Sequence, residues 1–144
     1  MDDKFSCLPS PIPYGAVCVG PNDWLDQAAL ADREGRSFID PVAALAWLRD
    51  DAATGRGDPS RLLLLHQDAF AGAEGTDQLV NWLENLSALR APYLPVLLHG
   101  DLPAEPLVRF FRAGLFDALV VPVDRPRWVN MLIRAEKRFA IRQQ

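Results

Sequence analysis

The strongest constraint on the fold is a run of four consecutive leucines, Leu62–Leu65, with no polar residue among them. A strand with one face in water alternates polar and apolar side chains, so an unbroken run is typical of a parallel strand covered on both faces. The run is also too short to form a helix of its own. Similar short runs occur at 16–19, 37–39, 95–98 and 118–121, and each is followed by a segment with helical periodicity. The sequence therefore predicts an α/β domain.

Capping residues mark the ends of several predicted helices. Asp40 can cap a helix whose first residue is Pro41, and Gly114 can end the helix that contains Leu107 and Phe110. A further helix with apolar residues over 24–30 is predicted after a cap at Asn22 or Asp23, and Gly35 ends it. Five such strand and helix units with right-handed crossovers predict a single doubly wound, five-stranded parallel sheet of order 2-1-3-4-5, which is the flavodoxin-like arrangement. Ligands of such sheets bind at the carboxyl ends of the strands.

The chain is expected to form one domain with an N-terminal arm. Pro9, Pro11 and Pro13 fix φ and remove amide donors, so residues 1–13 are predicted to be extended and residues 14–144 to form the domain. The N-terminus is acidic and proline-broken, and no apolar run has membrane-spanning length. Two cysteines are too few for a zinc site, and no disulfide is needed at this length. We therefore expect a cytoplasmic protein without membrane insertion.

The distribution of charge bears on the class of partner. Residues 1–123 carry a formal charge of −8, whereas residues 124–144 carry +4. Capture of nucleic acid requires a cationic face that releases counterions, so the acidic body argues against direct nucleic-acid binding.

Several short motifs resemble those of the receiver domain of two-component response regulators, the CheY-like fold. The matching stretches are Asp40–Leu45 at the second helix, Tyr93–Leu98 at the fourth strand, Arg112–Asp117 before the fifth strand and Val121–Asp124 after it. The resemblance spans about residues 16–139 and implies the receiver fold. It also implies a metal site of acidic residues after strand one, a phosphoacceptor aspartate after strand three, a hydroxyl after strand four and a lysine after strand five.

The residues that receiver chemistry requires are replaced in this sequence. Magnesium prefers hard carboxylate oxygens, and the lysine balances the phosphoryl charge. Gly20 and Pro21 occupy the acidic positions, and His66 occupies the phosphoacceptor position. His99 or Gly100 occupies the hydroxyl position, Val121 the lysine position and Ala118 the position of the switch aromatic. We therefore expect a pseudo-receiver that takes no phosphate.

Among degenerate receivers, the sequence most resembles the N-terminal domains of FleQ-type σ54-dependent regulators and of TadZ/CpaE-type ATPases. The stretch Tyr93–Asp101 and the pair Arg134-Ala135 carry this resemblance. It implies a regulatory partner or a fused ATPase module, and the chain is either standalone or part of a longer regulator. The expected function is a phosphorylation-independent signalling module of a bacterial regulator that acts by protein–protein contact. Because no nucleophile, base and oxyanion donor can be placed together, we expect neither an enzyme nor a cofactor.

A second hypothesis is a small-molecule or metal-binding domain. His66 and His99 end neighbouring predicted strands, and Asp68 and Asp101 each follow two residues later. If both imidazoles reach one crevice, these four side chains could form a His2Asp2 cluster. Alternatively, each histidine is a strand-end residue that is hydrogen-bonded to backbone and fills space left by the lost phosphorylation site.

The last expectation is a homodimer through the fourth helix, the fifth strand and the fifth helix, the face that receivers commonly use. Phe110, Phe111 and Trp128 would supply apolar anchors, with Arg109 and Arg112 at their rim. The alternative for these aromatics is core packing.

Overall fold

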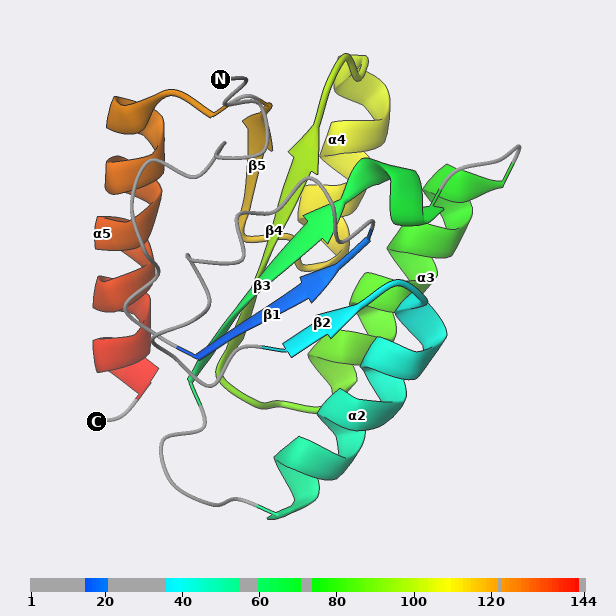
Figure 1. Ribbon diagram of the computed structural model, residues 1–144, viewed down its shortest axis with the longest axis vertical. Coiled ribbons are helices and arrows are strands. Elements are labelled where there is room, and N and C mark those ends of the chain that lie inside the picture. Colours follow the sequence, from blue (N-terminus) through cyan, green and yellow to red (C-terminus); the bar gives the residue numbers. More distant parts are fainter. Residues whose placement is uncertain (1–14, 21–35, 55–59, 71–73, 122, 143–144) are drawn as a thin grey trace, which may run out of the picture.

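The described residues form a parallel sheet with helices on both faces (Figure 1). The computed structural model describes residues 15–20, 36–54, 60–70, 74–121 and 123–142. The strands are β1 Gly15–Val19, β2 Arg36–Phe38, β3 Arg61–His66, β4 Tyr93–His99 and β5 Asp117–Val120. They form one sheet in the order β2-β1-β3-β4-β5, and every neighbouring pair is parallel. The predicted α/β class with a parallel sheet is confirmed.

The sheet separates the core into two layers, and helices cover both of its faces. The helices are α2 Pro41–Thr54, α3 Gly75–Ala88, α4 Ala104–Ala113 and α5 Arg125–Arg142, with a 3-10 helix η2 at Gln67–Phe70. Helix α5 covers one face of the sheet, and α2, α3 and α4 cover the other (Figure 1). On β3, Leu62 and Leu64 pack on the α5 side, whereas Leu63 and Leu65 pack on the opposite side. Burial on both faces explains why this strand lacks polar residues.

Local chemistry sets the ends of α2 and α4 as the sequence predicts. The carboxylate of Asp40 accepts a hydrogen bond of 3.0 Å from the Val42 amide, and Pro41 is the first residue of α2. Gly114 ends α4 with φ of 119°, in the left-handed region that favours glycine. A Cβ at Gly114 would lie 2.5 Å from Ser87 Oγ of α3, so the absence of a side chain also allows these elements to approach closely.

A polar network joins α2 to the amino ends of β3 and β4. Arg61 donates two hydrogen bonds to the Asp51 carboxylate, at 2.7 and 2.9 Å, and the Tyr93 hydroxyl donates a third at 2.6 Å. The Arg61 guanidinium also lies 5.1 Å from the centre of the Trp47 ring. Burial opposes ionisation of Asp51, but the hydrogen bonds from Arg61 and Tyr93 outweigh it and lower the pKa of this carboxyl. The network fixes α2 to the sheet at the amino ends of these strands. It does not extend to their carboxyl ends.

Some expectations fall on residues that the structure does not describe. The arm over 1–13, the helix over 24–30, Cys7 and Pro21 lie outside the described residues. Cys18 is buried in β1, and burial raises the pKa of its thiol to about 12. Within the described ranges, no helix combines the length and apolar character needed to cross a membrane.

Candidate functional site

The carboxyl ends of the parallel strands bring the receiver-equivalent positions to one edge of the sheet (Figure 1). Gly20 directly follows β1, His66 ends β3, and Val121 follows β5. The Gly20 amide donates to the Phe38 carbonyl at 2.8 Å, and the Val121 amide donates to the His99 carbonyl at 2.9 Å. This edge, defined by Gly20, His66, His99, Gly100 and Val121, is called the lip below.

Gly20 and His66 are in direct contact at the lip. A Cβ built at Gly20 would lie 2.5 Å from His66 Cβ, closer than side-chain atoms approach each other. Gly20 also has φ of 138°, a backbone conformation that residues other than glycine rarely adopt. Position 20 therefore cannot carry an acidic side chain in this backbone, whatever its neighbour at position 21.

The imidazole of His66 is held by the chain that follows it. Its Nδ1 accepts a hydrogen bond of 3.0 Å from the Asp68 amide, so the neutral ring carries its proton on Nε2. The Asp68 carboxylate lies 3.7 Å from the same Nδ1 and would form an ion pair if the ring were protonated. The side chain is 15% exposed. This geometry orients the imidazole at the end of β3 but provides no acyl-phosphate chemistry.

The expectation that both imidazoles share one crevice is wrong. In the pairing of β3 with β4, His66 lies beside Leu98. Paired residues of parallel strands project to the same face and successive residues to opposite faces, so His66 shares the α5 side with Leu98. His99 projects to the side of α3 and α4, where its Nδ1 lies 3.2 Å from the Gly100 carbonyl. The sheet separates the two rings.

The geometry of the described residues does not support a metal site at the two histidines. Across the residues that the structure describes, no three His, Cys, Asp or Glu side chains are grouped to hold a metal ion. His66 lies near Asp68 alone among the four candidates, and Asp101 is exposed after β4. Val121 packs against the apolar cluster beneath α5 and carries no charge to balance a phosphoryl group. The strand-end interpretation of the histidines fits this geometry better than a His2Asp2 cluster.

A cavity of about 310 Å³ lies beside the lip, on the α3 and α4 side of the sheet. Its lining includes Gln67, Phe70, Thr76, Leu97, Leu102 and Phe110, but neither histidine. The Gln67 side chain accepts a hydrogen bond of 3.0 Å from the Gly100 amide, which fixes β3 to the turn after β4. Polar groups of Gln67, Asp68 and Thr76 line this cavity together with its apolar side chains.

Two of the predicted interface anchors belong to the core. Trp128 is fully buried among Leu64, Leu98 and Met131, and Phe110 is 3% exposed in the opposite layer. The prediction that these two rings form a docking surface is therefore wrong. The spacing of Trp128, Met131, Ala135 and Phe139 already placed the tryptophan on the apolar stripe of its helix.

The other predicted interface residues lie at the surface. Phe111 is 45% exposed and Arg112 is also exposed. Arg109 donates to Asp77 of α3 at 2.7 Å, so it links two helices of the same domain. Val108 and Val120, which the sequence analysis did not select, are 47% and 48% exposed. Because Ala118 packs on the α4 side, Val120 two residues later faces the same side at the free edge of the sheet.

The comparisons with known proteins identify the fold. No family model and no curated protein matches the chain. A pilus assembly-related protein from Burkholderia pseudomallei has a TM-score of 0.55 and 21% identity, over 86% of this chain and 90% of that one. The pilus assembly protein CpaE from Caulobacter crescentus has a TM-score of 0.53 and 16% identity, over 85% and 94%. The response regulator StyR has a TM-score of 0.50 and 20% identity, over 91% of this chain and 63% of StyR.

The chain has a receiver-like fold. The resemblance to TadZ/CpaE-type receiver domains that the sequence indicates is confirmed at the level of fold. Within this receiver-like domain, the lip carries glycine, imidazole and valine in place of the acidic, phosphoacceptor and lysine positions.

Proposed function

We propose that the receiver-like domain is a phosphorylation-independent regulatory module of a bacterial regulator and acts through protein–protein contact. The observation that supports this most directly is the contact of Gly20 with His66. It leaves no room for the acidic group that would hold magnesium beside a phosphoacceptor. A receiver-like fold without its chemistry can still present its outer helices and strands to a partner.

The proposed partners follow from the fold neighbours and the exposed apolar surface. Two of the similar proteins are pilus assembly proteins, which favours a regulator of assembly at the cell envelope, working from the cytoplasm. The module would contact a regulatory protein or a fused ATPase module and would catalyse no reaction itself. The body of the chain is acidic and the basic residues gather in the last helix, which argues against broad capture of nucleic acid.

We expect no phosphorylation when the protein is incubated with acetyl phosphate and Mg²⁺. His66 does not form the acyl phosphate of an aspartate, and neither Gly20 nor Val121 supplies charge to the site. Intact-mass spectrometry should show no added phosphate, and tryptophan fluorescence should show no Mg²⁺-dependent quench. A functional receiver treated in parallel serves as the positive control. An added phosphate mapped to Asp68 or Asp101 would overturn the proposal.

The proposed module is also a homodimer, through a surface formed by Val108, Phe111 and Val120. Val108 and Phe111 are three residues apart on α4 and therefore share a face, while Val120 lies on the edge strand β5. Arg112 of the same helix lies at the surface beside Phe111 and can form the polar rim. Compared with the sequence-based interface, Phe111 remains an anchor, whereas Phe110 and Trp128 do not.

The dimer can be tested with one charged substitution on this surface. We expect sedimentation equilibrium at tens of micromolar to show a dimer for the parent chain and a monomer for Phe111→Asp. Both proteins should have similar unfolding curves, because exposed positions tolerate substitution. Val42→Asp is the matched control, since Val42 is 73% exposed but lies on α2. A monomeric parent chain, or a Phe111→Asp variant that stays dimeric, contradicts this interface.

A further inference from the structure

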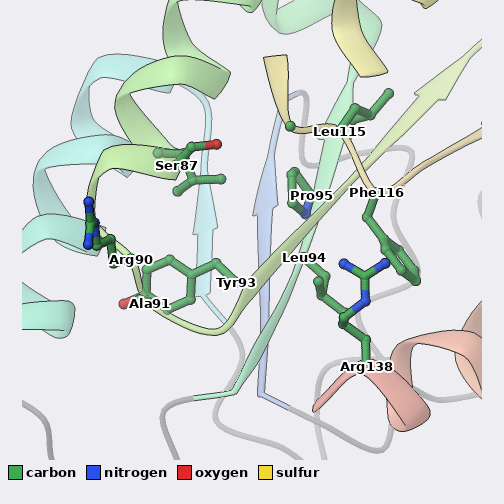
Figure 2. Close-up of a pocket in the computed structure, with 11 residues that line it drawn as sticks. Ser87, Arg90, Ala91, Tyr93, Leu94, Pro95, Leu115, Phe116 and Arg138 are labelled. Carbon is green, nitrogen blue, oxygen red and sulfur yellow. The ribbon is translucent and has the colours of Figure 1, made fainter. Parts of the chain in front are cut away.

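A second cavity, of about 330 Å³, lies at the amino ends of β4 and β5, opposite the lip (Figure 2). It is formed where the end of α3, the start of β4, the turn into β5 and the C-terminal half of α5 meet. Figure 2 shows the Ser87 hydroxyl directed toward this space from α3, and Arg138 directed toward Leu94 and Phe116 from α5. A volume of this size is in the range of small-molecule sites.

The charges around this cavity are of one sign. Its lining contains Arg90 and Arg138 but no carboxylate. Among the residues that the structure describes, no acidic side chain forms an ion pair with either guanidinium. This is unusual for a chain with a net charge of −4, in which several other arginines are paired. The cavity therefore has a cation at each side, Arg90 beside α3 and Arg138 on α5 (Figure 2), and both can attract an anion from outside the domain.

Arg138 is positioned for such a role by its aromatic neighbour. Its guanidinium lies 5.4 Å from the centre of the Phe116 ring, which restricts the long side chain without using its hydrogen-bond donors. Arg134, one turn earlier on α5, lies 5.6 Å from the same ring, but it is bonded to the Asp117 carboxylate. The two arginines share one ring, and only Arg138 lines the cavity with its donors available.

The remaining walls are suited to an apolar body. Leu94, Pro95 and Leu115 are buried residues that line the cavity together with the Phe116 ring. Tyr93 contributes its ring, whereas its hydroxyl is bonded to Asp51 on the other side. Gly114 keeps the wall near Ser87 open, because a Cβ there would reach the Ser87 oxygen. The Ser87 hydroxyl lies 3.3 Å from the Ala113 carbonyl and adds a polar group to this wall.

We propose that this cavity binds a small organic anion, with its carboxylate or phosphate group on Arg138 and its apolar body against Leu94, Pro95 and Phe116. Arginine recognises both kinds of anion with its planar fork of donors. This site lies at the opposite edge of the sheet from the lip, so it does not depend on the regulatory role proposed above.

The test is a titration of the full chain followed by ¹H–¹⁵N NMR. The probes are benzoate and phenyl phosphate, with benzamide as the neutral analogue and inorganic phosphate as the anion without an apolar body. We expect saturable shifts of the Ser87, Gly114 and Phe116 amides with the two organic anions, and much weaker ones with benzamide and inorganic phosphate. Tighter binding of phenyl phosphate would identify the ligand class as a phosphate ester. Tighter binding of benzoate would identify it as a carboxylate.

Two substitutions on α5 form a matched pair. Arg138→Gln should weaken binding by about tenfold or more, as expected for loss of hydrogen bonds to a charged group. Arg134→Gln removes the same charge from the same ring and should leave the affinity unchanged. Arg138→Lys keeps the charge without the planar fork and should bind with intermediate affinity. Thermal unfolding of each variant separates loss of the site from loss of the fold. Arg90→Gln removes the charge on the far side of the cavity and should weaken binding less than Arg138→Gln.

Four results would overturn the proposal. The first is the absence of saturable shifts with both organic anions. The second is binding of benzamide as tight as that of benzoate, which would remove the role of charge. The third is equal affinity of inorganic phosphate and phenyl phosphate, which would indicate a simple ion site without a role for the apolar walls. Equal losses in Arg134→Gln and Arg138→Gln would likewise assign the effect to general charge.

Discussion

A Trp128→Ala variant is expected to lose about 3–5 kcal/mol of its free energy of unfolding, the range for truncation of a large buried aromatic. Trp128 is fully buried in the amino-terminal part of α5. It belongs to the core layer that joins this helix to the sheet. Domains of this kind have a total stability of about 5–15 kcal/mol. Trp128→Asp, which would also bury a charge, should therefore fail to fold rather than yield a folded monomer.

Urea unfolding followed by far-UV circular dichroism measures this loss. The control is Phe111→Ala, which truncates a half-exposed aromatic side chain on α4 and should change stability by much less. A Trp128→Ala variant as stable as the parent chain would mean that the tryptophan is not a core residue and would restore it as a candidate for the interface.

An Asp51→Ala variant is expected to lose about 2–4 kcal/mol, close to the cost of removing one partner of a buried ion pair. The side chains of Asp51 and Arg61 are 15% and 13% exposed, so most of the pair is shielded from water. The substitution removes the carboxylate acceptor of both Arg61 and Tyr93. Asp50→Ala is the matched control, because Asp50 is an exposed neighbour on the same helix. Equal unfolding midpoints for the two variants at neutral pH would contradict this role of Asp51.

The pH dependence of stability gives an independent measure of the same network. Because the folded pKa of Asp51 is lower than that of the unfolded chain, its contribution is complete at neutral pH and is lost as pH falls below about 4. Burial, followed by the bond to Asp51, raises the pKa of Tyr93, so its contribution is lost as pH rises above about 10. Asp51→Asn should flatten the acid limb of the stability curve, and Tyr93→Phe should flatten the alkaline limb.

The backbone was the more predictable part of this protein, because its signals are local. The four leucines lie inside β3, and the run 95–98 lies inside β4. The capping residue Asp40 and the left-handed Gly114 define helix ends through contacts within a few residues. In contrast, the sequence does not mark the 3-10 helix over Gln67–Phe70, since no periodicity identifies so short an element.

The site was harder to predict because it depends on register. A shift of one residue between β3 and β4 would pair His66 with His99 and place both rings on the same face, and the sequence does not specify that pairing. The network of Asp51, Arg61 and Tyr93 was missed for a related reason. Its members are separated by 10 and 42 residues, and only the packing of α2 against the sheet brings them together.

The contact between Gly20 and His66 also determines how this domain could acquire phosphotransfer. The atom of His66 that obstructs position 20 is its Cβ, which every residue except glycine possesses. Replacing His66 with aspartate would therefore leave the obstruction in place, and an acidic residue introduced first at position 20 would meet it as well. Neither single replacement is useful before the other, and both require the turn after β1 to move. For protein engineering as for natural selection, the path to a phosphorylatable receiver begins with a change of backbone rather than with a change of functional group.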